Sequence, residues 1–238
     1  MIVVVPMAGR GSRYENSGFD LPKPLIHVAD RPMILWALHG LKEFQVSQFV
    51  FVLLREHEER FGVMKLIRNH VKENVSFELL DSVTDGQLST VLKAGEIIDV
   101  EEDVLVVASD TLVVGDIYAD ACASSWDGLI SVANLSGDRW SFAKSNSMGE
   151  VEEVAEKVRI SDQASTGQYY FRHGKDLVRF GSELILEGER TKGEYYVIPV
   201  YQKMIDAGLH IGISNTREMW DLGTPEAKLY FEQNYRVS

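Results

Sequence analysis

The sequence predicts an α/β fold, a doubly wound mixed sheet with an inserted antiparallel β layer. Short apolar runs without alternation, such as residues 2–5, are typical of parallel strands that are buried on both faces. Segments with apolar residues three and four positions apart follow these runs in the first half of the chain and indicate amphipathic helices. Alternating patterns dominate the second half and indicate antiparallel strands.

The first half supplies the parallel part of the predicted sheet. Its strands are expected at residues 2–5, 48–54, 75–80 and 103–108. Its helices are expected at residues 32–44, 58–74 and 86–98. In such folds the ligand crevice lies at the carboxyl ends of the strands. We therefore expect the glycines after the first strand and the "ASDT" segment after the fourth strand to line one crevice.

The second half is less regular and is expected to lie over the same crevice. Strands are expected at 128–135, 140–144, 150–158 and 164–174, a helix at 195–207, a short strand at 210–214, and a last helix from Thr224. No linker rich in Pro, Gly or Ser, no repeat and no low-complexity tract divides the sequence. Residues 1–238 are therefore expected to form one domain.

Composition excludes several classes of protein. The 238 residues contain 24 Lys and Arg against 36 Asp and Glu, and the net charge of −12 argues against broad binding to nucleic acid or to anionic membranes. The single cysteine, Cys122, allows no internal disulfide and is expected to be buried. The histidines lack the paired spacing of a zinc site, and no apolar run could span a bilayer. We expect a cytoplasmic enzyme or binding protein. The sequence leaves its oligomeric state open, and a homo-oligomer is one option.

The segment after the first strand, "PMAGRGSR", is the first candidate ligand site. Gly9 and Gly11 allow the backbone to approach a ligand and to direct amide groups at an anion. Taken together with the later "PKP", this loop has a basic residue at each end, Arg13 and Lys23, which could hold a polyphosphate. The same residues are also compatible with a surface turn that carries solvated charges.

Together, "PMAGRGSR", the residues that follow it and "PKPLI" resemble the signature of the nucleotidyltransferases that make nucleotide-sugars from an NTP and a sugar 1-phosphate. In that family a strand leads into an "LAGGxGTRL" loop and then "PKPL". Pro6 and Met7 replace the family's Leu-Ala here, and this loop variant resembles enzymes of surface-polysaccharide loci. The resemblance implies a Rossmann-like, glycosyltransferase-A-like fold. It also implies that the loop binds the nucleotide through Ala8, Gly9, Gly11 and Ser12.

The resemblance continues at two segments expected to bind the nucleotide and a metal. The family segment that recognises the base resembles "DGQLST", which implies that Gln87 and Gly86 read the base; the alternative is a helix start capped by Asp85. The family strand that ends in a metal-binding aspartate resembles "VLVVASDTLV". This implies that Asp110 binds Mg²⁺ and that Ser109 lies beside the nucleotide, although a turn cap is an alternative for Asp110.

Two further segments are expected to hold the acceptor. The family strand that ends in Glu-Lys resembles "EVEEVAEKVRIS", which implies that Glu156 binds sugar hydroxyls and Lys157 the sugar phosphate. Without that likeness, both residues would belong to an alternating edge strand with solvated charges. The substrate-facing strand of the family resembles "ASTGQYYF", where Gly167 lets the sugar lie against the backbone; the alternative is a β-bulge.

The last two motifs lie before the two C-terminal helices. The acidic segment of the family resembles "KGEYYVIPVYQKMIDAG" and implies that Glu194 contacts the substrate; otherwise it is a charge at a helix start. The closing motif resembles "MWDLGTPEAK" and implies that Asp221 supplies the second Mg²⁺ carboxylate. Local residues also predict a helix there, with Thr224 as N-cap and Pro225 at its first position.

The resemblance favours transfer of a nucleoside monophosphate from an NTP to a sugar 1-phosphate with release of pyrophosphate, for surface polysaccharide synthesis. Arg13, Lys23 and Lys157 are the implied catalytic cations. The base and the acceptor stay open, so cytidylyl transfer to phosphocholine or another phosphorylated small molecule is an alternative.

Two other classes of protein fit the sequence less well. A non-catalytic nucleotide-sugar-binding regulator is disfavoured because the loop arginine, the loop lysine and both implied metal carboxylates are present. A dinucleotide-dependent oxidoreductase is set aside because its fingerprint needs a third glycine where Tyr14 stands.

Overall fold

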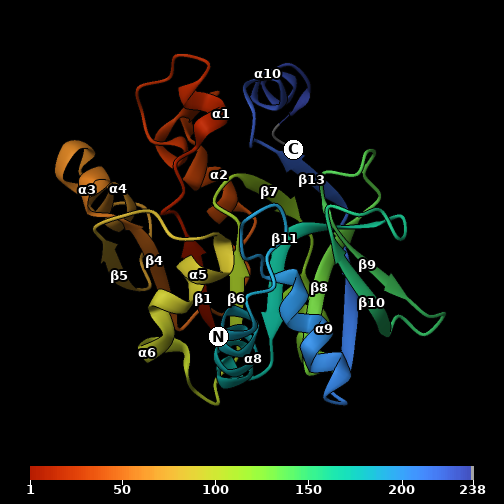
Figure 1. Cartoon of the computed structure of the whole chain (residues 1–238). Helices are drawn as coiled ribbons and strands as arrows, with labels where there is room; N and C mark the ends of the chain where they lie inside the picture. Colours follow the sequence, from red (N-terminus) through yellow and green to blue (C-terminus); the bar gives the residue numbers. More distant parts are fainter. Residues whose placement is uncertain (237–238) are drawn as a thin grey trace.

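The computed structural model describes residues 1–236 and arranges them around one mixed β-sheet (Figure 1). The strand order is β10-β9-β11-β6-β1-β4-β5, with β8 beside β11 and β12 beside β8. β1 lies between the parallel strands β4 and β6, while β11 runs antiparallel to β6 and joins the second half of the chain to the first. The α/β class and the mixed sheet are therefore confirmed.

The elements have the following bounds. The strands of the main sheet are β1 (Ile2–Pro6), β4 (Gln48–Leu54), β5 (Asn74–Leu80), β6 (Val104–Val107), β8 (Gly128–Ala133), β9 (Ser141–Ser145), β10 (Val151–Glu156), β11 (Gln163–Phe171) and β12 (Ile211–Asn215). Two small antiparallel ribbons pair β2 (His27–Val28) with β3 (Arg31–Pro32), and β7 (Thr111–Val114) with β13 (Glu218–Asp221). The helices are α1 (Ser12–Glu15), η1 (Lys23–Leu25), α2 (Met33–His39), α3 (Arg55–Phe61), α4 (Val63–Arg68), α5 (Gln87–Val91), η2 (Leu92–Ala94), α6 (Gly95–Ile98), α7 (Ile117–Cys122), α8 (Gly174–Glu187), α9 (Ile198–Asp206) and α10 (Pro225–Asn234).

Helices cover both faces of the sheet, as the doubly wound prediction requires. Successive residues of β1 point to opposite faces, so Val4 packs in one core cluster and Val3 in another. α5, α6, α8 and α9 contribute to the cluster around Val4, and α2, α4 and α7 to the cluster around Val3. Each fully buried side chain of this kind stabilises the fold by roughly 1.5–3 kcal/mol.

A third core cluster joins the start of the chain to its end. It contains Tyr14 of α1, Trp36 of α2, Leu222 after β13 and Phe231 of α10. The rings of Trp36 and Phe231 meet edge to face with centroids 4.9 Å apart. Figure 1 shows α1, β13 and α10 gathered at one end of the sheet. This cluster positions the glycine loop against the C-terminal motif.

Several local features differ from the expectations, and the helix expected at 86–98 is divided into α5, η2 and α6. The helix expected at 58–74 is two helices, α3 and α4, because Gly62 has a φ of 64° and interrupts the helical backbone. α8 was not expected from the sequence, although Leu177, Phe180 and Leu184 recur on its buried face at spacings of three and four. Cys122 is exposed, not buried, because it ends α7 at the surface.

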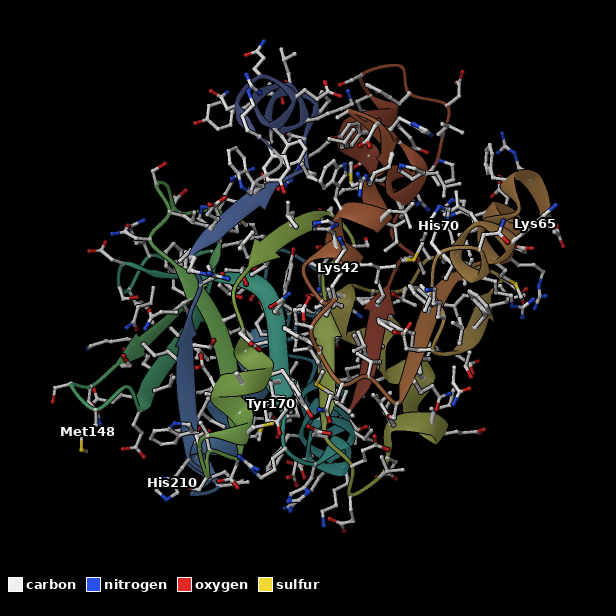
Figure 2. All side chains as sticks on the ribbon, turned by 180° about the vertical axis from the view of Figure 1, so that it is seen from behind. Lys42, Lys65, His70, Met148, Tyr170 and His210 are labelled. Atoms are coloured by element: carbon white, nitrogen blue, oxygen red, sulfur yellow. The ribbon has the colours of Figure 1, made fainter. Side chains whose placement is uncertain are left out.

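The antiparallel strands extend the sheet at the edge opposite α4. Viewed from behind, Lys65 of α4 and Met148 of the β9–β10 turn lie at opposite ends of the molecule (Figure 2).

The predicted start of α10 is confirmed, because the Thr224 side chain accepts a hydrogen bond from Ala227 N at 3.1 Å and Pro225 is the first helical residue. Within residues 1–236, no helix is long and apolar enough to cross a membrane.

Candidate active site

The glycine loop lies at the carboxyl end of β1 and leads into α1. Gly11 has a φ of 67°, and a Cβ there would lie 2.9 Å from Lys23 Cβ, so both the backbone and the close approach of Lys23 favour glycine. Gly9 keeps an ordinary φ and has open space beside it. The loop therefore brings its own backbone and Lys23 to one side of a cavity.

This first cavity has a volume of about 510 Å³ and collects most residues predicted to bind the nucleotide. The residues that line it and were predicted from the sequence as site residues are Ala8, Gly9, Gly11, Lys23, Gly86, Gln87, Ser109, Asp110 and Glu194. Ser12 begins α1 and does not line it. The loop and the "ASDT" segment therefore share one crevice, as expected from the order of the strands.

The segment predicted to read the base is held by a close backbone contact. Gly86 has a φ of 126°, and a Cβ on it would lie 2.5 Å from Tyr195 O. Leu88 N donates to the same carbonyl oxygen at 3.0 Å. The alternative role for Asp85 as a helix cap is wrong, because its carboxylate pairs with Arg190 at 2.7 Å and α5 has no side-chain cap.

A second cavity, of about 220 Å³, collects the residues predicted to bind the acceptor and the metal. The residues that line it and were predicted from the sequence as site residues are Arg13, Gln87, Asp110, Glu156, Lys157, Gly167 and Asp221. Glu194, the third predicted acceptor contact, lines the first cavity instead. The two cavities have Gln87, Asp110 and Tyr196 in common, so molecules bound in each would meet at Asp110.

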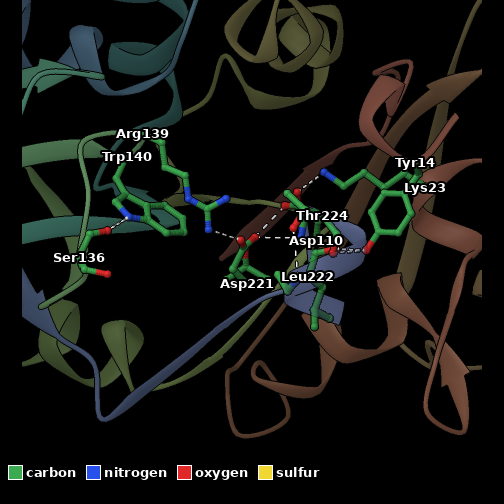
Figure 3. A network of polar contacts seen from close by, with 12 residues as sticks. Tyr14, Lys23, Asp110, Ser136, Arg139, Trp140, Asp221, Leu222 and Thr224 are labelled. Carbon is green, nitrogen blue, oxygen red and sulfur yellow. Dashed lines mark hydrogen bonds and ion pairs between the residues drawn. The ribbon is translucent and has the colours of Figure 1, made fainter. Parts of the chain in front are cut away.

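The two predicted metal-binding aspartates are neighbours in space. β7 and β13 pair antiparallel with Asp221 opposite Thr111, and Leu222 N donates to Asp110 O at 2.9 Å. Asp221 Oδ1 and Asp110 Oδ2 lie 2.8 and 3.0 Å from the point that a Cβ on Gly223 would occupy. Figure 3 shows both carboxylates in one polar network. The absent side chain of Gly223 thus leaves a small space between two carboxylate oxygens.

Each of these carboxylates has its own cation. Lys23 Nζ forms an ion pair with Asp110 Oδ2, and Arg139 Nη2 donates to Asp221 Oδ2 at 2.6 Å. Burial by itself would raise the pKa of Asp110, but the charge and hydrogen bond of Lys23 hold it below the ordinary value. Asp110 is therefore ionised near neutral pH, as a metal ligand must be.

The carboxylate pair fits a hard divalent cation. Two carboxylate oxygens converge on one point at Gly223. Across residues 1–236, no group of three or more His, Cys, Asp or Glu residues is arranged to hold a metal, so the protein itself would supply few ligands. Mg²⁺ suits such a site because it keeps several waters and is commonly bound by one or two carboxylates together with substrate phosphates.

Glu156 ends β10, Lys157 directly follows it, and both lie on the wall of the second cavity. Glu156 is 8% exposed and accepts a hydrogen bond from Ser141 Oγ, so the edge-strand alternative with a solvated charge is wrong for this residue. Burial raises the pKa of Glu156 above its ordinary value. Lys157 has a φ of 57°, and its ammonium donates to Tyr196 OH, which donates to Glu194.

Gly167 lies where β11 crosses the end of β6. Its φ is 85°, and a Cβ on it would lie 2.7 Å from Ala108 Cβ. The pairing of β11 with β8 shifts register between Ser165 and Tyr169, so the β-bulge alternative is confirmed. The bulge and the cavity wall are the same feature, because Gly167 also lines the second cavity.

Several residues of the site were missed by the sequence analysis. Tyr14 is buried in α1, and its hydroxyl lies 2.6 Å from Leu222 O and 2.9 Å from Thr224 O, which ties the glycine loop to the Asp221 segment. Arg139 and Tyr196 reach the site from loops. Tyr14 stands between the charged residues Arg13 and Glu15, and this pattern could have indicated a buried aromatic side chain beside the loop. No local pattern distinguishes Arg139 from other exposed arginines.

Comparison with known proteins identifies related sequences and a closely similar structure. The Nucleotidyl transferase family model matches residues 2–237. A UTP–glucose-1-phosphate uridylyltransferase of Komagataeibacter xylinus is 26% identical over 155 residues, which are 65% of this chain and 51% of that protein. A probable mannose-1-phosphate guanylyltransferase 2 of Arabidopsis thaliana is 30% identical over 90 residues, 38% of this chain and 24% of that protein. The chain thus aligns with about half or less of the length of these curated relatives.

The structural similarity extends over the whole chain. A nucleoside-diphosphate-sugar pyrophosphorylase from Vibrio cholerae RC9 superposes with a TM-score of 0.88 and 26% sequence identity, covering 98% of this chain and 100% of that one. The mixed sheet with its antiparallel extension is therefore the fold of a known nucleotidyltransferase structure.

Proposed function

The chain belongs to the nucleotidyl transferase family, and from this premise we propose that it transfers a nucleoside monophosphate from an NTP to a sugar 1-phosphate, releasing pyrophosphate. The observation that supports this most directly is the meeting of the two cavities at Asp110, beside a second carboxylate and two cations. Residues 1–238 would form one cytoplasmic catalytic domain without a nucleic-acid partner. The nucleotide-sugar product would serve surface polysaccharide synthesis.

The proposed reaction is a single in-line displacement. A phosphate oxygen of the acceptor forms a new bond to the α-phosphorus of the NTP, while the bond from that phosphorus to the bridging α–β oxygen breaks and pyrophosphate leaves with that oxygen. Little covalent chemistry is needed from the protein, so catalysis comes from positioning and from neutralising charge. The NTP would occupy the first cavity and the acceptor the second, with the reacting groups at their junction.

The loop and its cations would neutralise the triphosphate. Arg13 forms no hydrogen bond or ion pair through its side chain in the part of the chain that the structure describes, and it lines the second cavity close to Asp110. Together with the amides of residues 9–11, Arg13 would stabilise the leaving pyrophosphate. Lys23 lines the first cavity and Lys157 the second, and both would reduce the repulsion between the two anionic substrates.

Asp110 and Asp221 would hold Mg²⁺, which when bound supplies charge neutralisation to the reacting phosphates. In this proposal Gln87 and Gly86 bind the base, Ala8, Ser12 and Ser109 flank the nucleotide, and Glu156, Gly167 and Glu194 contact the acceptor. Glu156 suits a sugar because a buried carboxylate is a strong hydrogen-bond acceptor for hydroxyl groups.

The test is pyrophosphate release from ATP, CTP, GTP, UTP and dTTP, each with Mg²⁺ and a panel of sugar 1-phosphates, phosphocholine and other phosphorylated small molecules. We expect release to require one NTP and one acceptor and to stop in EDTA. The names of the two curated relatives differ in the base, so every NTP is included. Activity with phosphocholine alone would favour the alternative cytidylyltransferase. If no pair releases pyrophosphate but a nucleotide-sugar raises the thermal stability of the protein, the results would favour a non-catalytic nucleotide-sugar-binding regulator.

A further inference from the structure

Arg139 is a cation of the site that the proposed mechanism leaves without a role. It lies between β8 and β9, in a segment held by a hydrogen bond of 3.0 Å from Trp140 Nε1 to Ser136 O. Its guanidinium stacks on the Trp140 ring, 4.1 Å from the centroid, and donates to Asp221 Oδ2 at 2.6 Å (Figure 3). The segment therefore presents an arginine to one of the two proposed metal carboxylates.

Arg139 and a divalent cation would compete for the same carboxylate. Asp221 Oδ1 accepts from Gly223 N at 2.8 Å and faces Asp110, while Oδ2 is taken by Arg139. The Asp221 side chain is 15% exposed, so its charge is poorly screened by solvent. A cation bound between the two aspartates would place two positive charges on one carboxylate, and their repulsion weakens the arginine pair.

A released guanidinium would face the second cavity. Arg139, Trp140 and Lys157 all line this cavity, and the Arg139 side chain is 45% exposed. A guanidinium binds a phosphate through two parallel hydrogen bonds, which a lysine cannot do. The acceptor phosphate would therefore offer Arg139 a replacement for Asp221 within the same cavity.

We propose that Arg139 exchanges Asp221 for the phosphate of the acceptor when a divalent cation binds Asp110 and Asp221. The inference rests on the proposed function of this site and adds a phosphate-binding residue to it. Arg139 then has two effects that can be measured separately. It weakens cation binding before the acceptor arrives, and it strengthens binding of the acceptor.

The first effect is measured by titrating Mn²⁺ against the protein without substrates and following free Mn²⁺ by electron paramagnetic resonance. A partly exposed ion pair is worth up to about 1 kcal/mol, so Arg139→Gln is expected to bind Mn²⁺ about two- to fivefold more tightly than the wild type. Arg139→Lys keeps the charge and is expected to restore weak binding. Asp221→Asn is expected to lose Mn²⁺ binding at this site.

Arg217→Gln is the matched control for removal of a positive charge. Arg217 directly precedes β13, is exposed and, within residues 1–236, makes no hydrogen bond or ion pair through its side chain. Its Mn²⁺ affinity should equal that of the wild type. Unchanged or weaker Mn²⁺ binding by Arg139→Gln would overturn the proposed competition.

The second effect is measured in the pyrophosphate assay. Losing one charge-assisted phosphate contact should raise the KM for the acceptor about tenfold or more in Arg139→Gln, with the KM for the NTP and kcat little changed. An unchanged acceptor KM would overturn the phosphate role. A wild type that is inactive with every substrate pair would contradict the proposed function, while the Mn²⁺ titration, which needs no turnover, would still decide the competition.

Discussion

Gly223→Ala tests the carboxylate pair most directly, because the change adds one methyl group at the point where two carboxylate oxygens converge. The new Cβ would lie 2.8 Å from Asp221 Oδ1, 3.0 Å from Asp110 Oδ2 and 3.6 Å from Lys23 Nζ. The first two distances are shorter than an ordinary contact between carbon and oxygen. The methyl would therefore occupy the proposed cation position and push the carboxylates apart.

The expected effect is large on turnover and small on stability. Loss of the electrostatic stabilisation centred on this point should lower kcat by about 10²–10³-fold, the range found when one preorganised transition-state contact is removed. Gly223 does not have a positive φ, so alanine fits its backbone and reduces the entropy of the unfolded chain. We expect the change in unfolding free energy to stay within about 1 kcal/mol, a shift of about 2–4 °C in Tm.

The assays are pyrophosphate release, Mn²⁺ titration and thermal unfolding on the same preparations. Gly95→Ala is the matched control, because Gly95 has helical φ and ψ at the start of α6 and open space around its Cβ position. It should keep wild-type turnover and Mn²⁺ affinity. Wild-type turnover by Gly223→Ala would refute the assignment of this point to the cation, because a methyl group and a metal ion cannot share it.

Three further changes test the parts around this centre. Asp110→Asn removes one carboxylate charge and should lower kcat by about 10²–10³-fold, and turnover near wild type would contradict its metal role. Tyr14→Phe leaves Leu222 O and Thr224 O without their contact to the hydroxyl and should lower the unfolding free energy by about 1–2 kcal/mol in urea titrations; an unchanged midpoint would contradict this. Glu156 has a raised pKa, so its contribution to stability is complete below its pKa in the unfolded chain and is lost as pH rises through the raised value. As the pH is raised from 4 to 8, the Tm of Glu156→Gln should therefore increase relative to the Tm of the wild type. A difference in Tm that does not change with pH would contradict the burial of this carboxylate.

The sequence alone determined the class of fold and the first wall of the site. Buried strands without alternation and helices with periodic apolar residues are local patterns, and the first four predicted strands occur close to their expected positions. The loop after β1 and the "ASDT" segment meet at one edge because parallel strands end at the same edge of a sheet. The helix start at Thr224 was also readable locally, because capping involves only neighbouring residues.

The tertiary structure decided how distant segments complete the site. Asp110 and Asp221 are brought together by the pairing of β7 with β13, which no local pattern predicted. Gly223 matters because of the space it leaves between their side chains, and Arg139 because its loop ends beside Asp221. Local sequence determines the conformation of a segment, whereas its partners depend on how the whole chain packs, and the chemistry at this junction is a property of those partners.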